Sequence, residues 1–187
     1  MALTENRDVP LGTPCPEFRL PSVDGRTVAR DDFRAAEGLV VMFLCNHCPY
    51  VQAVEDRIIA LRREYAPRGV QFVGICANDP TDYPDDRPDR LLDRWRKKEY
   101  GFPYLIDATQ DVARAFDAVC TPDLYVYDAA RRLAYHGRLD DNWQDTTRVH
   151  HRELAVALDA LLAHRPPARD QRPSMGCSIK WRKAPSR

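Results

Sequence analysis

The 187-residue sequence lacks a surplus of either charge, because 28 basic side chains balance 28 acidic ones. Proteins that bind nucleic acid through its phosphates need a basic surplus, so this balance argues against such a partner. No apolar run approaches the ~20 residues that a membrane-spanning helix needs, which argues against a membrane protein. The first ten residues carry Glu5, Arg7 and Asp8 and lack the apolar stretch of a secretory signal, so we expect a cytoplasmic protein.

What the sequence does contain is typical of one globular domain. Hydrophobic residues make up 44% and charged residues 30%, a mix that favours a folded chain over a disordered one. We expect an N-terminal segment over residues 1–10, a domain over residues 11–165 and a C-terminal tail over residues 166–187. The tail is basic and rich in proline, but it also contains the apolar residues Met175, Cys177, Ile179 and Trp181. These residues favour a tail that docks on the domain.

Buried strands and amphipathic helices alternate along the chain. Apolar runs over residues 39–44 and 70–76 predict two buried strands, and apolar positions three and four residues apart, the first of them Val51, predict a helix that runs to about Ala66. Further strands are expected at 103–106, 124–127 and 133–136, and further helices after caps at Asp86 and Thr109 and over 147–164. An Asp24-Gly25 turn predicts an N-terminal hairpin-like extension. This order predicts an α/β fold with a central mixed β-sheet flanked by helices.

The six cysteines contain one close pair, Cys45-Asn46-His47-Cys48. Without a secretory signal, most of the cysteines should be reduced thiols rather than a disulfide framework. Cys76 ends a predicted buried strand and is expected in the core, and Cys15 is expected to be a free thiol. The close pair is the exception, because a CxxC motif indicates redox chemistry or half of a metal site.

The CxxC motif follows the predicted strand 39–44 directly and precedes the predicted helix. Free backbone N–H groups and the positive end of the helix dipole favour a thiolate there, so we expect Cys45 to be the exposed nucleophile at the helix start. Cys48, one turn further on, should be the resolving thiol that displaces substrate from a mixed disulfide. A cationic His47 would stabilise the thiolate and tune the redox couple. Pro49 fits the first helical turn.

A second motif, Thr121-Pro122, precedes the predicted strand 124–127, and with the CxxC motif it resembles the thioredoxin superfamily. The phrases FLCNHCPYV, CTPDLYVYD and PSMGCSIKW resemble the AhpC/TSA-related, peroxiredoxin-like proteins that carry a thioredoxin-type CxxC. The resemblance covers residues 11–183 and implies a thioredoxin-like fold. It also implies that Cys45 and Cys48 form a redox pair, that Pro122 is a cis-proline facing them, and that the Thr121 backbone pairs with incoming substrate.

The resemblance implies a thiol–disulfide oxidoreductase, or antioxidant protein, that cycles Cys45 and Cys48 between dithiol and disulfide. It implies no bound cofactor and no metal. Its expected partners are a disulfide-containing protein or small thiol substrate and an electron donor such as the thioredoxin or glutathione systems. Related folds often dimerise, so a homodimer is among the expected assemblies.

A peroxiredoxin-like thiol peroxidase is an alternative, because Cys48 falls where those enzymes place the peroxidatic cysteine. Cys45, however, stands where they have a Thr or Ser, and Cys120-Thr121-Pro122 occupies the region of their peroxide-polarising Arg. Cys48 or Cys45 would then attack the peroxide, and the other cysteine would resolve it. Leu39 occupies the position of the buried carboxylate in thioredoxins, so proton transfer needs another group. Asp107 and Asp123 are candidates by chain position.

A non-enzymatic redox-sensing or zinc-binding module is a further alternative. Cys45 and Cys48 would need two more ligands for tetrahedral zinc, either Cys120 and Cys177 or His150 and His151, and neither pair has zinc-site spacing. Cys120 and Cys177 are also candidate accessory thiols that form a second disulfide or relay electrons. Otherwise Cys120 is a small loop residue and Cys177 a packing residue. The acidic run 85–89 is expected to be a solvated surface.

Overall fold

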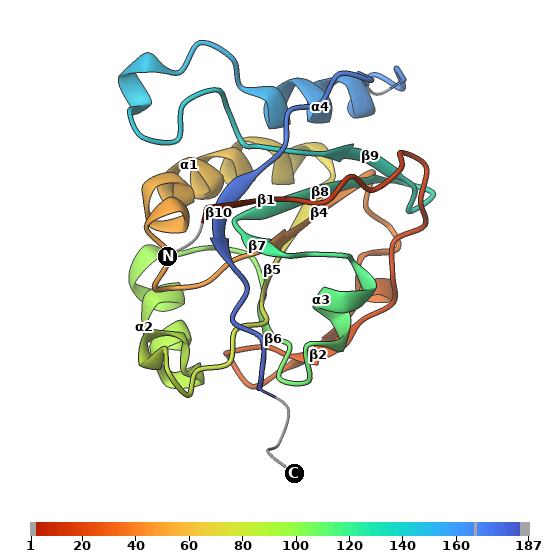
Figure 1. The fold of residues 1–187 in the computed structure, drawn as a ribbon. Helices are drawn as coiled ribbons and strands as arrows, with labels where there is room; N and C mark the ends of the chain where they lie inside the picture. The colour runs from red at the N-terminus through yellow and green to blue at the C-terminus, as the bar shows by residue number, and fades with distance from the viewer. Residues whose placement is uncertain (1–2, 167, 184–187) are drawn as a thin grey trace.

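A five-stranded mixed sheet forms the centre of the protein in the computed structural model, which describes residues 3–166 and 168–183 (Figure 1). Its strand order is β6-β5-β4-β8-β9. The strands span Gly38–Phe43 (β4), Val70–Cys76 (β5), Tyr104–Ile106 (β6), Asp123–Asp128 (β8) and Leu133–His136 (β9). β4, β5 and β6 run parallel, whereas β8 is antiparallel to both β4 and β9. The predicted mixed sheet is therefore confirmed.

Four α-helices accompany the sheet within the described residues. They span Pro49–Tyr65 (α1), Pro88–Lys98 (α2), Asp111–Ala115 (α3) and Glu153–Leu162 (α4). The prediction of one helix over 147–164 was wrong at its start. Thr146–Arg148 forms a separate 3-10 turn, which the Asp145 carboxylate caps by accepting from the Thr147 amide, and the backbone is extended at Val149. None of the four helices is long and apolar enough to cross a membrane.

Strand β4 is buried along its whole length because both faces of the sheet are covered. Val40 and Met42 pack into one apolar cluster with residues of α1, α2 and α4. Leu39, Val41 and Phe43 point the other way into a second cluster, which α3 and the N-terminal hairpin complete. A parallel strand covered on both faces reads as a continuous apolar run, which is why residues 39–44 predicted it.

The two ends of the chain meet in a small three-stranded sheet. Leu3–Glu5 (β1) pairs with Met175–Ser178 (β10), which pairs with Cys120–Thr121 (β7). Figure 1 shows blue β10 beside β1 and β7. The predicted hairpin forms separately from Arg19–Pro21 (β2) and Thr27–Ala29 (β3). Of the expected N-terminal segment and tail, residues 1–2, 167 and 184–187 lie outside the described residues.

Candidate functional site

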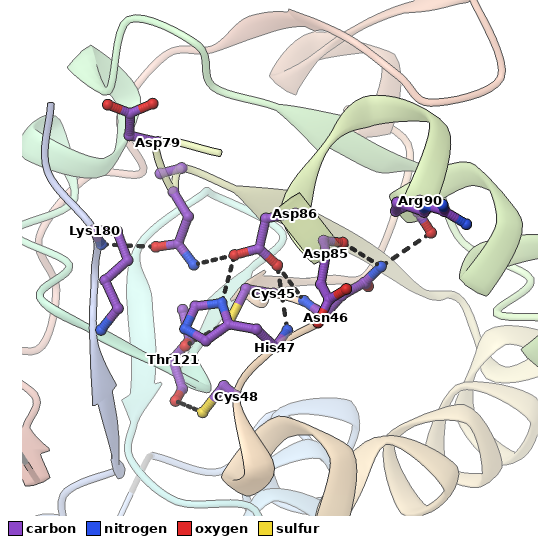
Figure 2. Close-up of polar contacts among 12 residues, drawn as sticks. Cys45, Asn46, His47, Cys48, Asp79, Asp85, Asp86, Arg90, Thr121 and Lys180 are labelled. Carbon is purple, nitrogen blue, oxygen red and sulfur yellow. Dashed lines mark hydrogen bonds and ion pairs between the residues drawn. The ribbon is translucent and has the colours of Figure 1, made fainter. Parts of the chain in front are cut away.

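The CxxC motif lies in the loop that joins β4 to α1 (Figure 2). Helix α1 begins at Pro49, and Cys48 is its N-cap residue. The expectation that Cys45 begins the helix was wrong by three residues. Proline is favoured at the first helical position, so Pro49 places the cap on the residue before it. The partial positive charge of the helix start is therefore at Cys48.

Both sulfurs of the motif are buried and meet Thr121 at the end of β7. Cys45 Sγ lies 3.2 Å from Thr121 Oγ1, and Cys48 Sγ lies 3.1 Å from the Thr121 carbonyl oxygen, to which it donates in its thiol form. The Cys45 side chain was expected to be exposed, but only 1% of this residue is accessible and 0% of Cys48. The Thr121–Pro122 peptide bond is cis, as the resemblance implied.

Cys48 is the thiol whose surroundings favour ionisation. A hydrogen bond from the Cys45 side chain is the largest cause, burial opposes it, and the Cys177 thiol and the Val51 amide add further donors. Together they lower the pKa of Cys48 from 9.0 to about 5. Donors aimed at a buried sulfur outweigh its desolvation here, so the surroundings favour the thiolate form of Cys48 over that of Cys45.

Cys45 shifts in the opposite direction. Burial raises its pKa well above the usual value, and the hydrogen bond to Cys48 and the charge of Asp86 raise it further. Two adjacent thiols cannot both ionise cheaply in a buried site. When the pair ionises, Cys48 is therefore the sulfur that loses its proton first, and Cys45 keeps its proton and donates.

Asp86 holds the CxxC loop in place, and sequence analysis did not assign it to the site. Its Oδ1 accepts from the backbone amides of Asn46 and His47 at 2.7 and 3.3 Å. Its Oδ2 accepts from the Asn78 side chain at 2.9 Å and contacts His47 Nδ1 at 2.6 Å. Burial opposes ionisation of Asp86, but these hydrogen bonds hold the pKa of its carboxyl below the usual value.

The predicted helix cap and solvated surface at Asp86 were both wrong. Arg87 is the N-cap of α2, and Asp86 is buried at the end of a 3-10 turn, Pro84–Asp86. Its partners on the CxxC loop lie about forty residues earlier in the chain, 39 for His47. The sequence around Asp86 gives no sign of so distant a contact, so the acidic run was interpreted as ordinary solvated surface.

His47 is directed at Asp86 rather than at the Cys48 sulfur (Figure 2). An ionised carboxylate accepts, so Nδ1 bears the proton that faces Asp86. Its Nε2 is buried and has no hydrogen-bond partner among the described residues. The imidazole also packs on the Tyr83 ring, with centroids 4.6 Å apart.

The two candidate accessory thiols lie on β7 and β10, but the structure does not bring them together. Cys177 pairs with Thr121, and Cys120 pairs with Ser178. Neighbouring residues of a strand point to opposite faces, so Cys120 and Cys177 face away from each other. Cys177 shares a face with Thr121, and its side chain hydrogen-bonds Cys48. The Cys120–Cys177 disulfide is therefore the wrong pairing for this register.

Neither carboxylate proposed for proton transfer contacts the CxxC sulfurs among the hydrogen bonds of the described residues. Asp107 accepts from the Ala113 amide at 2.8 Å at the start of α3, which is the role of a capping acid. Asp123 is buried with Tyr125 and His136, which contact its two oxygens at 2.9 and 2.8 Å. Asp86 is the buried acid beside the motif.

One group of side chains in the described part of the chain has metal-ligand geometry. Cys45, His47 and Asp86 offer ligand atoms within 4.8 Å of one another. Tetrahedral zinc needs a fourth ligand, and the Asp86 oxygens are already engaged by the loop amides and Asn78. His150 and His151 were expected early on the last helix but are exposed residues ahead of α4. They do not join the cysteines.

Comparisons with known proteins agree with this architecture. The family model described as the AhpC/TSA family matches residues 11–136. No curated protein sequence matches the chain. A solved structure of an uncharacterized conserved protein from Geobacillus kaustophilus is 43% identical, has a TM-score of 0.94 and covers 100% of this chain and 99% of its own. A hypothetical protein from Sinorhizobium meliloti 1021 is 36% identical, with a TM-score of 0.93 and coverage of 97% and 100%.

More distant structures share the fold. A thiol:disulfide interchange protein of the thioredoxin family from Chlorobium tepidum is 19% identical, with a TM-score of 0.64 and coverage of 83% of this chain and 99% of its own. Peroxidoxin BcpB from Mycobacterium tuberculosis is also 19% identical, with a TM-score of 0.56 and coverage of 82% and 94%. The chain has a thioredoxin-like α/β fold, and it belongs to the AhpC/TSA family.

Proposed function

We propose that the protein is a thiol–disulfide oxidoreductase in which Cys48 is the nucleophile and Cys45 the resolving thiol. One observation carries the proposal. Cys48 is the N-cap residue of α1, and its buried sulfur accepts from the Cys45 thiol, which lowers its pKa. This reverses the roles expected from sequence, since the helix begins at Pro49 rather than at Cys45.

The reaction is thiol–disulfide exchange. The Cys48 thiolate attacks one sulfur of a substrate disulfide, which forms a mixed disulfide and releases the other substrate sulfur as a thiolate. Cys45 then attacks Cys48 Sγ, which closes the Cys45–Cys48 disulfide and releases the second substrate thiol. The substrate gains two electrons and the protein loses two. A dithiol of the thioredoxin class or glutathione restores the protein.

Cys45 must lose its proton before it attacks, and the His47–Asp86 pair is the proposed acceptor, since Cys45, His47 and Asp86 have ligand atoms within 4.8 Å of one another. Asp86 orients the imidazole through Nδ1, and the buried Nε2 has no hydrogen-bond partner among the described residues. A histidine oriented by a carboxylate is a common general base. This pair replaces the buried carboxylate that the sequence lacks at Leu39.

Substrate approaches beside the cis-proline. Tyr50, Pro122, Trp143 and Met175 contribute to a mainly apolar hollow there, and the Tyr50 and Trp143 rings lie 4.3 Å apart. Arg138, Asp140 and Asp141 also line the hollow, so it combines aromatic walls with polar groups that can bind the backbone of an extended peptide segment.

Dithiothreitol-dependent insulin reduction tests the proposal. We expect wild-type protein to accelerate precipitation of the insulin B chain and Cys48→Ser to be inert. Loss of a covalent nucleophile costs on the order of 10³-fold or more in rate. A wild-type rate equal to dithiothreitol alone, or a Cys48→Ser variant as fast as wild type, would contradict the proposal.

A thiol peroxidase is the second candidate, and the complete burial of the Cys48 thiolate favours it. A peroxide is small enough to reach such a sulfur, where attack on the O–O bond gives a sulfenic acid and releases water or an alcohol. No arginine contacts Cys48 among the described side chains to polarise the peroxide. Stopped-flow peroxide consumption no faster than that of free cysteine would eliminate this candidate.

A further inference from the structure

The C-terminal strand β10 places a third thiol against the Cys48 sulfur. Cys177 lies directly opposite Thr121 across the β7–β10 ladder, and the Thr121 carbonyl is the acceptor 3.1 Å from Cys48 Sγ. The Cys177 side chain hydrogen-bonds Cys48, and its backbone amide also reaches that sulfur. Cys48 therefore contacts two thiols, one from its own loop and one from the other end of the sequence.

The backbone around Cys177 is fixed too closely to be a loosely docked tail. A side chain at Gly176 would bring its Cβ to 2.0 Å from the Thr121 carbonyl oxygen and 3.1 Å from Pro122 Cδ. Only glycine allows such a close approach, and it sets the depth at which Cys177 enters the site. On either side, the Ser174 hydroxyl donates to the Gly137 carbonyl at 2.6 Å, and the Lys180 amide donates to the Asn78 side chain at 2.8 Å.

The Lys180 contact ties the tail to the CxxC loop itself. Asn78 accepts from Lys180 through its oxygen and donates to Asp86 through its nitrogen, at 2.8 and 2.9 Å. Asp86 in turn holds the Asn46 and His47 amides. Figure 2 shows this chain of contacts from Lys180 to the loop. The strand that carries Cys177 and the loop that carries Cys48 are thus held in one rigid polar network.

We infer that Cys177 is a second resolving thiol, which forms a Cys48–Cys177 disulfide in exchange with Cys45–Cys48. This inference rests on the proposed dithiol chemistry of Cys48. When Cys48 carries a substrate as a mixed disulfide, Cys177 attacks Cys48 Sγ, and the substrate leaves as a thiol with the Cys177 proton. When Cys45–Cys48 is already closed, the same attack breaks that bond and forms Cys48–Cys177. The proton then passes to Cys45, with no net change in oxidation state.

The two disulfides would join different segments of the chain. A Cys45–Cys48 disulfide closes a loop within four residues, whereas Cys48–Cys177 links α1 to the C-terminal strand. Burial and the hydrogen bond to Cys48 raise the pKa of Cys177 to about 12, so in the reduced protein it stays a thiol and donates. Cys48 is the sulfur common to both disulfides.

Peptide mapping of a full-length Cys45→Ser variant tests the inference, because trypsin separates the thiols. Residues 35–57 then contain Cys48 alone, residues 170–180 contain Cys177 and residues 115–131 contain Cys120. After oxidation with glutathione disulfide and alkylation, we expect a cross-link between 35–57 and 170–180. Cys120, on the other face of β7, is the internal control and should be alkylated.

The matched control is the double variant Cys45→Ser/Cys177→Ser. It should keep a glutathione adduct on Cys48, and the adduct should be lost from the single variant on the order of 100-fold faster, because attack by Cys177 is intramolecular. An adduct equally stable in both variants, with Cys177 alkylated in the single variant, would overturn the inference. If Cys45→Ser does not fold by circular dichroism, Cys45→Ala serves in the same assay.

The outcome separates this inference from the proposed function. Insulin reduction by wild type without a Cys48–Cys177 cross-link in the variant overturns the inference alone. A cross-link in the variant, together with a wild-type protein that neither forms Cys45–Cys48 nor reduces insulin, overturns the proposed dithiol cycle and leaves the second thiol in place.

Discussion

Two groups of buried cysteines occupy this protein, and their thiols behave differently. Cys45, Cys48 and Cys177 contact one another at the start of α1, where the Cys48 pKa falls to about 5. Cys15 and Cys76 are also buried; burial raises the pKa of Cys15 to about 12, and burial with the charges of Asp86 and Asp107 raises that of Cys76 higher still. Burial by itself therefore makes a thiol inert, and reactivity comes from donors aimed at one sulfur.

The largest expected effect is on the free energy of unfolding, which should depend on pH because of Cys48. Cys15 and Cys76 should contribute no such dependence in this pH range. The folded pKa of Cys48, about 5, lies below its usual 9.0, so between these values the unfolded chain binds the extra proton. Stability from Cys48 is complete above pH 9 and is lost as pH falls through 5, on the order of 5 kcal/mol in all. Urea denaturation of wild type and Cys48→Ser should converge toward pH 5. Parallel curves across this range would contradict the assignment of the thiolate.

The next effect concerns the carboxylate that organises the first group. Asp86→Asn removes a charged acceptor of the Asn46 and His47 amides and should cost about 2 kcal/mol of unfolding free energy. It should also lower the Cys45 pKa, because the charge of Asp86 raises it. Asp85→Asn is the matched control, since Asp85 is exposed. Equal urea midpoints for the two variants would contradict the conclusion that Asp86 stabilises the CxxC loop.

A smaller effect is expected when the Cys45 thiol is removed, because this thiol donates to Cys48 and has no counterpart among the described thiols at Cys76. Cys45→Ala removes the largest favourable hydrogen bond to the thiolate, which should raise the Cys48 pKa by about 1 unit. The ultraviolet absorbance of the thiolate, followed against pH, measures the shift. Cys76→Ala should leave the titration in place. An unchanged midpoint in Cys45→Ala would assign the low pKa to the helix terminus instead.

The smallest effect is expected at Cys120, which precedes Thr121 in the chain but points to the opposite face of β7 from the first group. Burial raises its pKa above the usual range, and its thiol reaches the Pro122 carbonyl at 3.8 Å. Cys120→Ala should cost about 1 kcal/mol of stability for a small lost volume and leave insulin reduction unchanged. A large loss of turnover would move Cys120 into the redox group.

Much of the framework was predictable because its signals are local. The apolar run at residues 39–44 predicts β4, and the Asp24-Gly25 turn predicts the hairpin. Thr121-Pro122 predicted the cis peptide through resemblance. The start of α1 was misplaced although Pro49 was visible, because the positional preference of proline was applied to the whole turn and not to the first helical position.

The sequence by itself determined the mixed α/β sheet and the position of a CxxC motif after a buried strand, since hydrophobic period and turn chemistry act over a few residues. Tertiary structure alone decided which sulfur is charged and which groups surround it. Asp86 reaches His47 across 39 residues, and Cys177 reaches Cys48 through a strand near the opposite end of the chain. A pKa is set by distances between groups in space, and those distances exist only after the chain has folded.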